Sequence, residues 1–201
     1  MAERPRMDKL NIKTMKQDYK KIIEKGFIEN ELELERTFIL ERKLRLLIPK
    51  NPNYKEDRKQ LRSIIKEYEK QNWSTDSIIT DKKIKESDYA EQIAEQERQF
   101  LAKRKEIIKT KLLENKLNQQ DLGAILKHSK SYISELMNGI NSFTKKDLII
   151  IHKLFDIKLE DLIPTTITQK DVNRMRKTIE KLGKNDLISK LYSSKSSHKV
   201  K

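Results

Sequence analysis

Residues 117–141, LNQQDLGAILKHSKSYISELMNGIN, contain the pattern of two short helices joined by a tight turn. The spacing of their apolar residues predicts one helix over 119–126, a turn at 127–129 and a second helix over 130–138. Four apolar side chains would then face inward: Leu122, Leu126, Ile133 and Leu136. Helices this short are not stable alone, so we expect them to bury their apolar faces in a compact bundle.

Capping residues indicate the ends of these helices and of those that follow. A residue that can cap a helix stands three positions before a carboxylate at two places: Asn118 with Asp121, and Thr144 with Asp147. Gly139 has the position of a helix terminator. Gly123 lies where the two helices cross, so a side chain larger than that of alanine would separate them. The sequence therefore predicts four short helices between 118 and 163.

At these residues the chain resembles the helix-turn-helix domain of the XRE family, which is also called the lambda-repressor-like family. The positions that match the family pattern are Leu117, Asn118, Gln119, Leu122, Gly123, Leu126, Ser129, Ser131, Ile133, Ser134, Asn138 and Gly139. Apolar residues between Leu148 and Ile163 resemble the closing helices of the same domain. Lys127 departs from the pattern, because the family usually has glycine in the turn. The resemblance implies a five-helix DNA-binding fold.

The second of the two helices is expected to read DNA. Its outer face carries short or polar side chains near its N-terminal end, and such groups can reach base edges in a major groove. The resemblance implies base contacts from five residues: Lys130, Ser131, Tyr132, Ser134 and Glu135. It implies phosphate contacts near helix ends from four more: Gln119, Lys127, Asn138 and Asn141. We expect a homodimer on double-stranded operator DNA, so the operator should be an inverted repeat.

A helical hairpin is predicted on the N-terminal side of this domain. In 56–71 the apolar residues fall at i, i+3, i+4 and i+7, which is one stripe of an amphipathic helix. Residues 29–48 supply a second stripe, and Pro49 and Pro52 interrupt the chain between the two. Residues 72–88 have no clear period and are rich in serine, threonine and aspartate, which favours a linker. From about residue 89 we expect a long polar helix that turns five apolar side chains inward: Phe100, Leu101, Ile108, Leu112 and Leu113.

The order of features in 28–69 resembles the N-terminal region of HigA-type antitoxins, which precedes an XRE domain in that family. The matching positions are Ile28, Asn30, Glu31, Leu34, Thr37, Leu40, Glu41, Pro49, Glu56, Asp57, Leu61, Ile64, Ile65, Tyr68 and Glu69. This resemblance implies that the protein neutralises a RelE/HigB-like mRNA-cleaving toxin and represses its own operon. Toxin contacts would come from the first hairpin helix, at Glu31, Glu35, Phe38 and Glu41. Carboxylates could attract a basic ribonuclease, although an ordinary solvated helix face has the same pattern.

Two stretches differ from the usual antitoxin pattern. Residues 74–100 are longer than the usual bridge to the DNA-binding domain, and 164–201 extend beyond its usual end. A free-standing XRE-family transcriptional repressor without a toxin partner is therefore an alternative. Its N-terminal module would then sense a signal or form oligomers.

Half of the net positive charge of the chain lies in the C-terminal region. The chain of 201 residues has a net charge of +14, and residues 164–201 hold 10 Lys and Arg against 3 Asp and Glu, or +7. Such an excess favours an anionic partner. Thr168 and Asp171 predict a capped helix with an apolar stripe (Val172, Met175, Ile179, Leu182) and a basic face (Arg174, Arg176, Lys177, Lys181, Lys184). This helix could pack on the domain, follow the DNA backbone, or do both, and 193–201 could be a solvated tail.

Other classes of function lack the residues they need. Cysteine is absent, the three histidines (His128, His152 and His198) fit no metal-binding motif, and the four glycines are too scattered to cradle a phosphate. We therefore expect no enzyme, no cofactor and no metal. The longest apolar run, 148–151, is far shorter than the roughly 18 residues that span a bilayer. We expect a cytoplasmic bacterial protein that does not enter a membrane.

The sequence thus predicts an all-α protein. It has an N-terminal helical hairpin module, a five-helix lambda-repressor-like helix-turn-helix domain and a C-terminal helix. The expected divisions are a partner-binding module at 1–72, a linker and connecting helix at 73–100, the DNA-binding domain at 101–164, and a basic helix with a flexible tail at 165–201.

Overall fold

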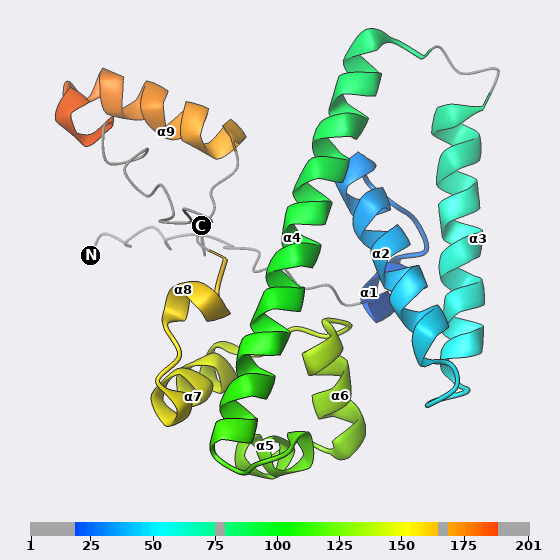
Figure 1. Cartoon of the computed structure of the whole chain (residues 1–201). Helices are drawn as coiled ribbons and strands as arrows, with labels where there is room; N and C mark the ends of the chain where they lie inside the picture. Colours follow the sequence, from blue (N-terminus) through cyan, green and yellow to red (C-terminus); the bar gives the residue numbers. More distant parts are fainter. Residues whose placement is uncertain (1–18, 75–78, 165–168, 189–201) are drawn as a thin grey trace, which may run out of the picture. The chain divides into compact units, whose positions relative to one another are not determined.

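Helices make up the regular structure of the residues that the computed structural model describes, which are 19–74, 79–164 and 169–188 (Figure 1). These residues contain no strand, which confirms the predicted all-α fold. No helix among them is both long and apolar enough to cross a membrane. The chain divides into two compact units, Met1–Ile163 and Pro164–Lys201.

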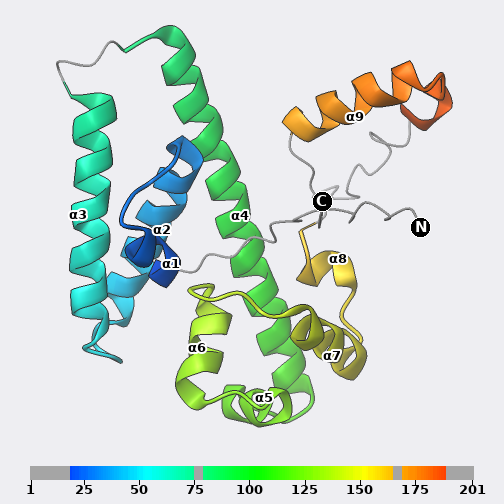
Figure 2. The same ribbon diagram turned by 180° about the vertical axis from the view of Figure 1, so that it is seen from behind.

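The described part of the first unit contains two groups of helices and one long helix that is common to both (Figures 1 and 2). The N-terminal module consists of α1 (Tyr19–Lys25), α2 (Glu31–Leu47) and α3 (Tyr54–Trp73). The long helix is α4 (Asp81–Glu114). The C-terminal group consists of α5 (Gln119–Leu126), α6 (Lys130–Asn138), α7 (Lys145–Phe155) and α8 (Leu159–Leu162).

Helices α2 and α3 form the predicted hairpin. Asn30 caps α2, because its side chain accepts a hydrogen bond of 3.0 Å from the Glu33 amide. The core of the module is a cluster of buried residues: Tyr19, Ile22, Leu40, Leu44, Tyr54, Leu61 and Ile140. Helix α1, which the sequence did not predict, contributes Tyr19 and Ile22 to this cluster. Ile140 follows α6, so the C-terminal group completes the core of the N-terminal module.

Helix α4 begins earlier than the sequence predicted. Its first residue is Asp81, and the Thr80 side chain caps it by accepting a hydrogen bond of 3.3 Å from the Lys83 amide. The prediction of a linker over 72–88 is therefore wrong for 72–73, which end α3, and for 81–88, whereas 75–78 lie outside the described residues. Threonine, serine and aspartate are as typical of a helix start as of a loop, and here they begin a helix.

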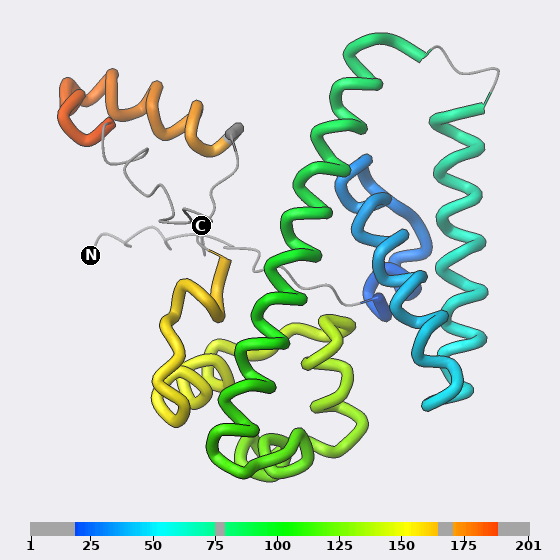
Figure 3. Tube along the Cα trace, in the orientation of Figure 1, coloured from blue at the N-terminus to red at the C-terminus, as the bar shows by residue number. Residues whose placement is uncertain are grey.

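Helix α4 packs against both groups, as the tube in Figure 3 also shows. Near its start, Ala90 and Ala94 are buried, and their small side chains allow a close approach of α2. Arg36 of α2 donates to both carboxylate oxygens of Glu97, at 2.8 and 2.5 Å. The salt bridge and the two alanines together hold α2 along the first half of α4.

The second half of α4 belongs to the core of the C-terminal group. That core contains Ile108, Leu112, Leu122, Leu126, Ile133, Leu136, Met137, Phe143, Leu148, Ile151, Phe155, Ile157 and Leu162. The four residues predicted to face inward from the two short helices are all among them. Leu113 was also predicted to face inward, and this is wrong, because its side chain is 75% exposed. One residue turns a helix by about 100°, which carries Leu113 away from the face of Ile108 and Leu112.

The second unit contains α9 (Gln169–Lys181) and a short 3-10 helix, η1 (Asn185–Leu187). Val172 is buried, whereas Leu182 lies beyond the end of α9 and is 68% exposed, so the predicted apolar stripe stops before it. Arg174 pairs with Asp171 at 2.9 Å and Arg176 with Glu180 at 3.3 Å. The predicted capping residue Thr168 lies outside the described residues.

Candidate nucleic-acid interface

Helices α5 and α6 begin and end at the predicted residues. The predicted capping box of α5 is present, since the Asn118 side chain accepts from the Asp121 amide at 3.2 Å and Asp121 accepts from the Asn118 amide at 2.8 Å. The Ser129 side chain caps α6 by accepting from the Tyr132 amide at 3.2 Å. Such caps involve residues only three apart, which is why the sequence predicts them well.

The turn between α5 and α6 is held by its backbone. Lys127 ends α5 in the left-handed conformation, with φ of 59°, and the His128 amide donates to the Gly123 carbonyl at 2.8 Å. A Cβ on Gly123 would lie 3.1 Å from the His128 carbonyl oxygen and 3.2 Å from Ile133 Cγ2, so these neighbours would have to shift by a few tenths of an ångström. Gly123 therefore fits the predicted close crossing. Lys127 adopts the conformation for which the family pattern has glycine.

The N-terminal end of α6 presents most of the side chains predicted to contact bases. Lys130 and Ser131 are exposed, and Ser134 is partly exposed. Tyr132 is also partly exposed, but its ring packs on the domain core and meets the His128 ring edge-on, with centroids 5.0 Å apart. We call the surface that these four residues form the reading surface, because it is where base contacts are predicted, and the contacts themselves stay a prediction.

Glu135 has a different position from the other four predicted base contacts. Its carboxylate accepts a hydrogen bond of 2.7 Å from the Tyr54 hydroxyl, and another of 2.6 Å from the Asn141 side chain. Burial and the Glu135 carboxylate together raise the pKa of Tyr54 to about 12. Glu135, predicted to contact a base, therefore joins α6 to α3, and Asn141, predicted to contact a phosphate, is bonded to Glu135. Sequence reasoning missed Tyr54, which lies 81 residues away.

Residues 108–162 match the family model of a helix-turn-helix domain, HTH_3. This segment is an XRE-type helix-turn-helix domain. The matched family is one of DNA-binding regulatory domains. The match begins inside α4 and does not include the N-terminal module. No curated protein and no solved structure matches the chain.

The predicted phosphate contacts of the helix-turn-helix domain lie at the ends of α5 and α6. Lys127 is exposed and Gln119 is partly exposed at the first position of α5. Asn138 accepts a hydrogen bond of 2.8 Å from Lys105 of α4 and donates one of 2.8 Å to the Ser134 carbonyl. Lys105, which the sequence analysis did not predict, thus adds a positive charge beside the end of α6. Burial and the positive charge of nearby lysines lower its pKa.

The N-terminal module contacts the end of α6 a second time through Lys43. Its ammonium group donates to the carbonyl of Gly139, the left-handed residue that ends α6, at 3.1 Å. Gly139 was predicted as the terminator, but nothing in the local sequence points to Lys43, 96 residues away. Helix α6 is thus held at its C-terminal end by α2 and α3.

The predicted toxin contacts on α2 are mostly used inside the fold. Glu31 is 5% exposed and accepts hydrogen bonds from the Tyr68 hydroxyl at 2.9 Å and the Trp73 indole at 3.1 Å, which removes it from any partner-facing surface. Glu41 pairs with Arg58 of α3 at 2.7 Å. Phe38 packs partly buried against the cluster of Ile28, Leu34 and Ile65.

Glu35 differs from the other predicted toxin contacts. Its side chain is partly exposed and makes no hydrogen bond or ion pair with the described residues. Burial and the negative charges of Glu91 and Glu31 raise its pKa. A positive charge supplied from outside would relieve this repulsion, so Glu35 is the predicted contact best placed to meet a partner.

The histidines of the described residues contact neighbours within the helix-turn-helix domain. No group of three or more His, Asp or Glu side chains among the described residues could hold a metal ion. His128 pairs with Asp147 at 3.1 Å, and His152 contacts the Ile157 carbonyl at 2.6 Å through Nδ1. Both histidines thus support the folding of the helix-turn-helix domain. His198 lies outside the described residues.

Proposed function

We propose that the protein is a sequence-specific DNA-binding regulator that represses its own operon. The observation that carries the proposal is the exposed reading surface at the N-terminal end of α6, within a segment that matches a helix-turn-helix model. Short polar and basic side chains at this place on a recognition helix can reach base edges. As a homodimer, the protein would place two such helices about one turn of DNA apart on an inverted repeat.

The test is a gel-shift titration with the DNA upstream of the gene and with a scrambled duplex of the same composition. The variant Lys130→Ala with Ser131→Ala should lose most of its preference for the upstream DNA, by about 1–3 kcal/mol for each lost base contact. A matched control is Lys85→Ala with Ser87→Ala on α4, far along the chain from α6. An unchanged preference in the α6 variant would refute the placement of the reading surface.

A finer proposal is that the regulator is the antitoxin of a type II toxin–antitoxin system and neutralises a RelE/HigB-like mRNA-cleaving toxin. Support comes from the α2–α3 hairpin, whose order of features resembles HigA-type antitoxins and which lies outside the matched domain. Glu35 supports it too, because an unpaired carboxylate is complementary to the basic surface of a ribonuclease. A free-standing repressor without a toxin partner is the alternative.

Co-expression separates the two candidates. If the neighbouring small reading frame encodes the toxin, its expression should stop growth, and the protein should restore growth and co-purify with it. Glu35→Gln should weaken that complex, whereas Glu67→Gln, at an exposed position of α3, should not. Absence of toxicity and of a co-purifying partner, together with tight binding to the upstream DNA, would leave the free-standing repressor.

A further inference from the structure

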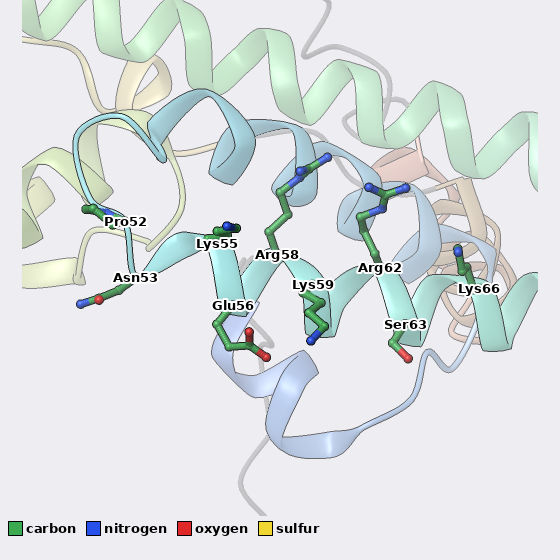
Figure 4. A pocket seen from close by; sticks show the side chains of 9 residues that line it. All are labelled: Pro52, Asn53, Lys55, Glu56, Arg58, Lys59, Arg62, Ser63 and Lys66. Carbon is green, nitrogen blue, oxygen red and sulfur yellow. The ribbon is translucent and has the colours of Figure 1, made fainter.

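One face of α3 carries a row of basic side chains that the proposed function has not used. The α3 basic stripe consists of Lys55, Lys59, Arg62 and Lys66, all of them exposed. At about 100° per residue these positions fall within roughly 60° of one another around the helix, and they extend over about 16 Å. Together with Pro52, Asn53, Glu56, Arg58 and Ser63 they line an open groove (Figure 4).

The stripe is not neutralised by the rest of the described chain. Its four side chains make no ion pair with any described residue, although other arginines and lysines of the first unit do. Arg58, one turn away on the same helix, pairs with Glu41, and Arg36 pairs with Glu97. Among the nine residues that line the groove, only Glu56 is acidic. A row of unpaired cations in an open groove is complementary to a polyanion.

The stripe begins beside the recognition helix. Lys55 directly follows Tyr54, whose hydroxyl is hydrogen-bonded to Glu135 of α6. The exposed Lys50, in the turn before α3, is close enough for its charge to lower the pKa of Lys105, and Lys105 is bonded to Asn138 at the end of α6. Positive charge therefore continues from the end of α6, where phosphates are expected, across the α2–α3 turn and along α3.

We propose that the α3 basic stripe binds the phosphate backbone of double-stranded DNA beside the segment that α6 reads. This proposal rests on the proposed function, because the continuity of charge with α6 selects DNA over other polyanions. The contact is electrostatic and independent of sequence, since lysine and arginine side chains recognise phosphate through charge. The N-terminal module would thereby extend the footprint beyond the site of the helix-turn-helix domain.

The salt dependence of binding to a short scrambled duplex tests the stripe directly. Each phosphate contact adds about 0.9 to the slope of log affinity against log salt concentration. The variant Lys59→Gln with Lys66→Gln should therefore reduce this slope by about 2, and its loss of affinity should be about tenfold greater at 50 mM than at 200 mM salt. Both positions are exposed, so the fold should be retained, and circular dichroism checks this.

The control is Lys82→Gln with Lys85→Gln, two exposed lysines at the start of α4, which is the end away from α6 (Figure 1). This variant makes the same change in net charge and should retain the slope of the unaltered protein. The proposal would be overturned if all three proteins had the same slope, or if the slope fell by the same amount in the two variants. Binding of the stripe to an acidic protein instead of DNA would leave the slope unchanged and would count against it too.

Failure of the stripe can be told apart from failure of the proposed function. The scrambled duplex measures only backbone contacts, whereas preference for the upstream DNA measures reading by α6. If the protein shows no preference for the upstream DNA but its stripe variant has a reduced slope, the stripe proposal stands and the proposed sequence-specific regulation is refuted. If the protein prefers the upstream DNA but the stripe variant has an unchanged slope, sequence-specific regulation stands and the stripe proposal is refuted.

Discussion

At the scale of single residues, two side chains of the N-terminal module form hydrogen bonds with the C-terminal end of α6. Tyr54 donates to Glu135, and Lys43 donates to the carbonyl of Gly139. A hydrogen bond to a partly buried charged group contributes more to stability than one between neutral groups. The two residues of the first contact are 81 positions apart in the sequence, and those of the second are 96 positions apart. The pattern of either segment alone therefore does not predict these contacts.

Replacement of Tyr54 by phenylalanine should destabilise the first unit while its ring stays in the core. The Glu135 carboxylate would lose one of its two donors, so we expect the free energy of unfolding to fall by about 1–2 kcal/mol in urea titrations. In a double-mutant cycle with Glu135→Gln, the two effects should not add. Additive effects would show that the hydroxyl and the carboxylate do not interact in solution.

Lys43 should make stability depend on pH in the mildly alkaline range. Burial, with the positive charge of Arg104 and other cations, lowers the pKa of Lys43 to about 8. In the unfolded chain its pKa is about 10.4, so between these values the unfolded state binds more protons than the folded state. The free energy of unfolding should therefore rise by about 1–2 kcal/mol from pH 8 to 9.5, before tyrosine ionisation opposes it.

The measurement is a series of urea titrations across that pH range. Lys43→Met keeps the aliphatic part of the side chain and removes the titrating group. Its free energy of unfolding should change little over the same interval. A rise of the same size in Lys43→Met would assign the pH dependence to another group.

At the scale of elements, the structure shows which sequence signals are sufficient for prediction. The bounds of α5 and α6 follow from caps and apolar spacing within a few residues, and both were predicted correctly. Helix α4 was predicted to begin late, because 81–88 have no apolar stripe of their own. The same limit applies to the site, where Lys130 and Ser131 could be placed on the exposed face but the pairing of Glu135 could not.

The crossing of α2 and α4 depends on small side chains. Ala94 is 1% exposed, so Ala94→Leu should force the two helices apart and lower the free energy of unfolding by about 1–3 kcal/mol. Ala102→Leu makes the same change at an exposed position of α4 and should have little effect. Thermal unfolding of both variants tests this prediction. If Ala94→Leu and Ala102→Leu unfold at the same midpoint temperature, the crossing tolerates a larger side chain.

At the scale of the whole molecule, the core of the N-terminal module is closed by a residue of the helix-turn-helix domain. Ile140 is 0% exposed and packs with α1, α2 and α3 residues, although it lies inside the matched segment. The two groups of helices therefore share part of their stabilisation, and α4 connects them without a break. We expect the first unit to unfold as one cooperative body.

Ile140→Ala tests this cooperativity. The substitution leaves a cavity where the buried isoleucine side chain packed, and this should lower the free energy of unfolding by about 2–5 kcal/mol. In hydrogen exchange, amides of both α2 and α7 should exchange faster, because opening one group would open the other. Faster exchange confined to one of the two helices would show that the groups unfold independently.

The buried position of Ile140 also limits how this DNA-binding domain can be exchanged between proteins. A segment cut out at 108–162 would carry an uncovered isoleucine and a Gly139 carbonyl without its lysine donor. It would also begin in the middle of α4. Grafting this segment onto another regulator would require a surface that covers Ile140 and a donor for the Gly139 carbonyl. The helix-turn-helix domain should therefore be transferred together with its neighbouring helices.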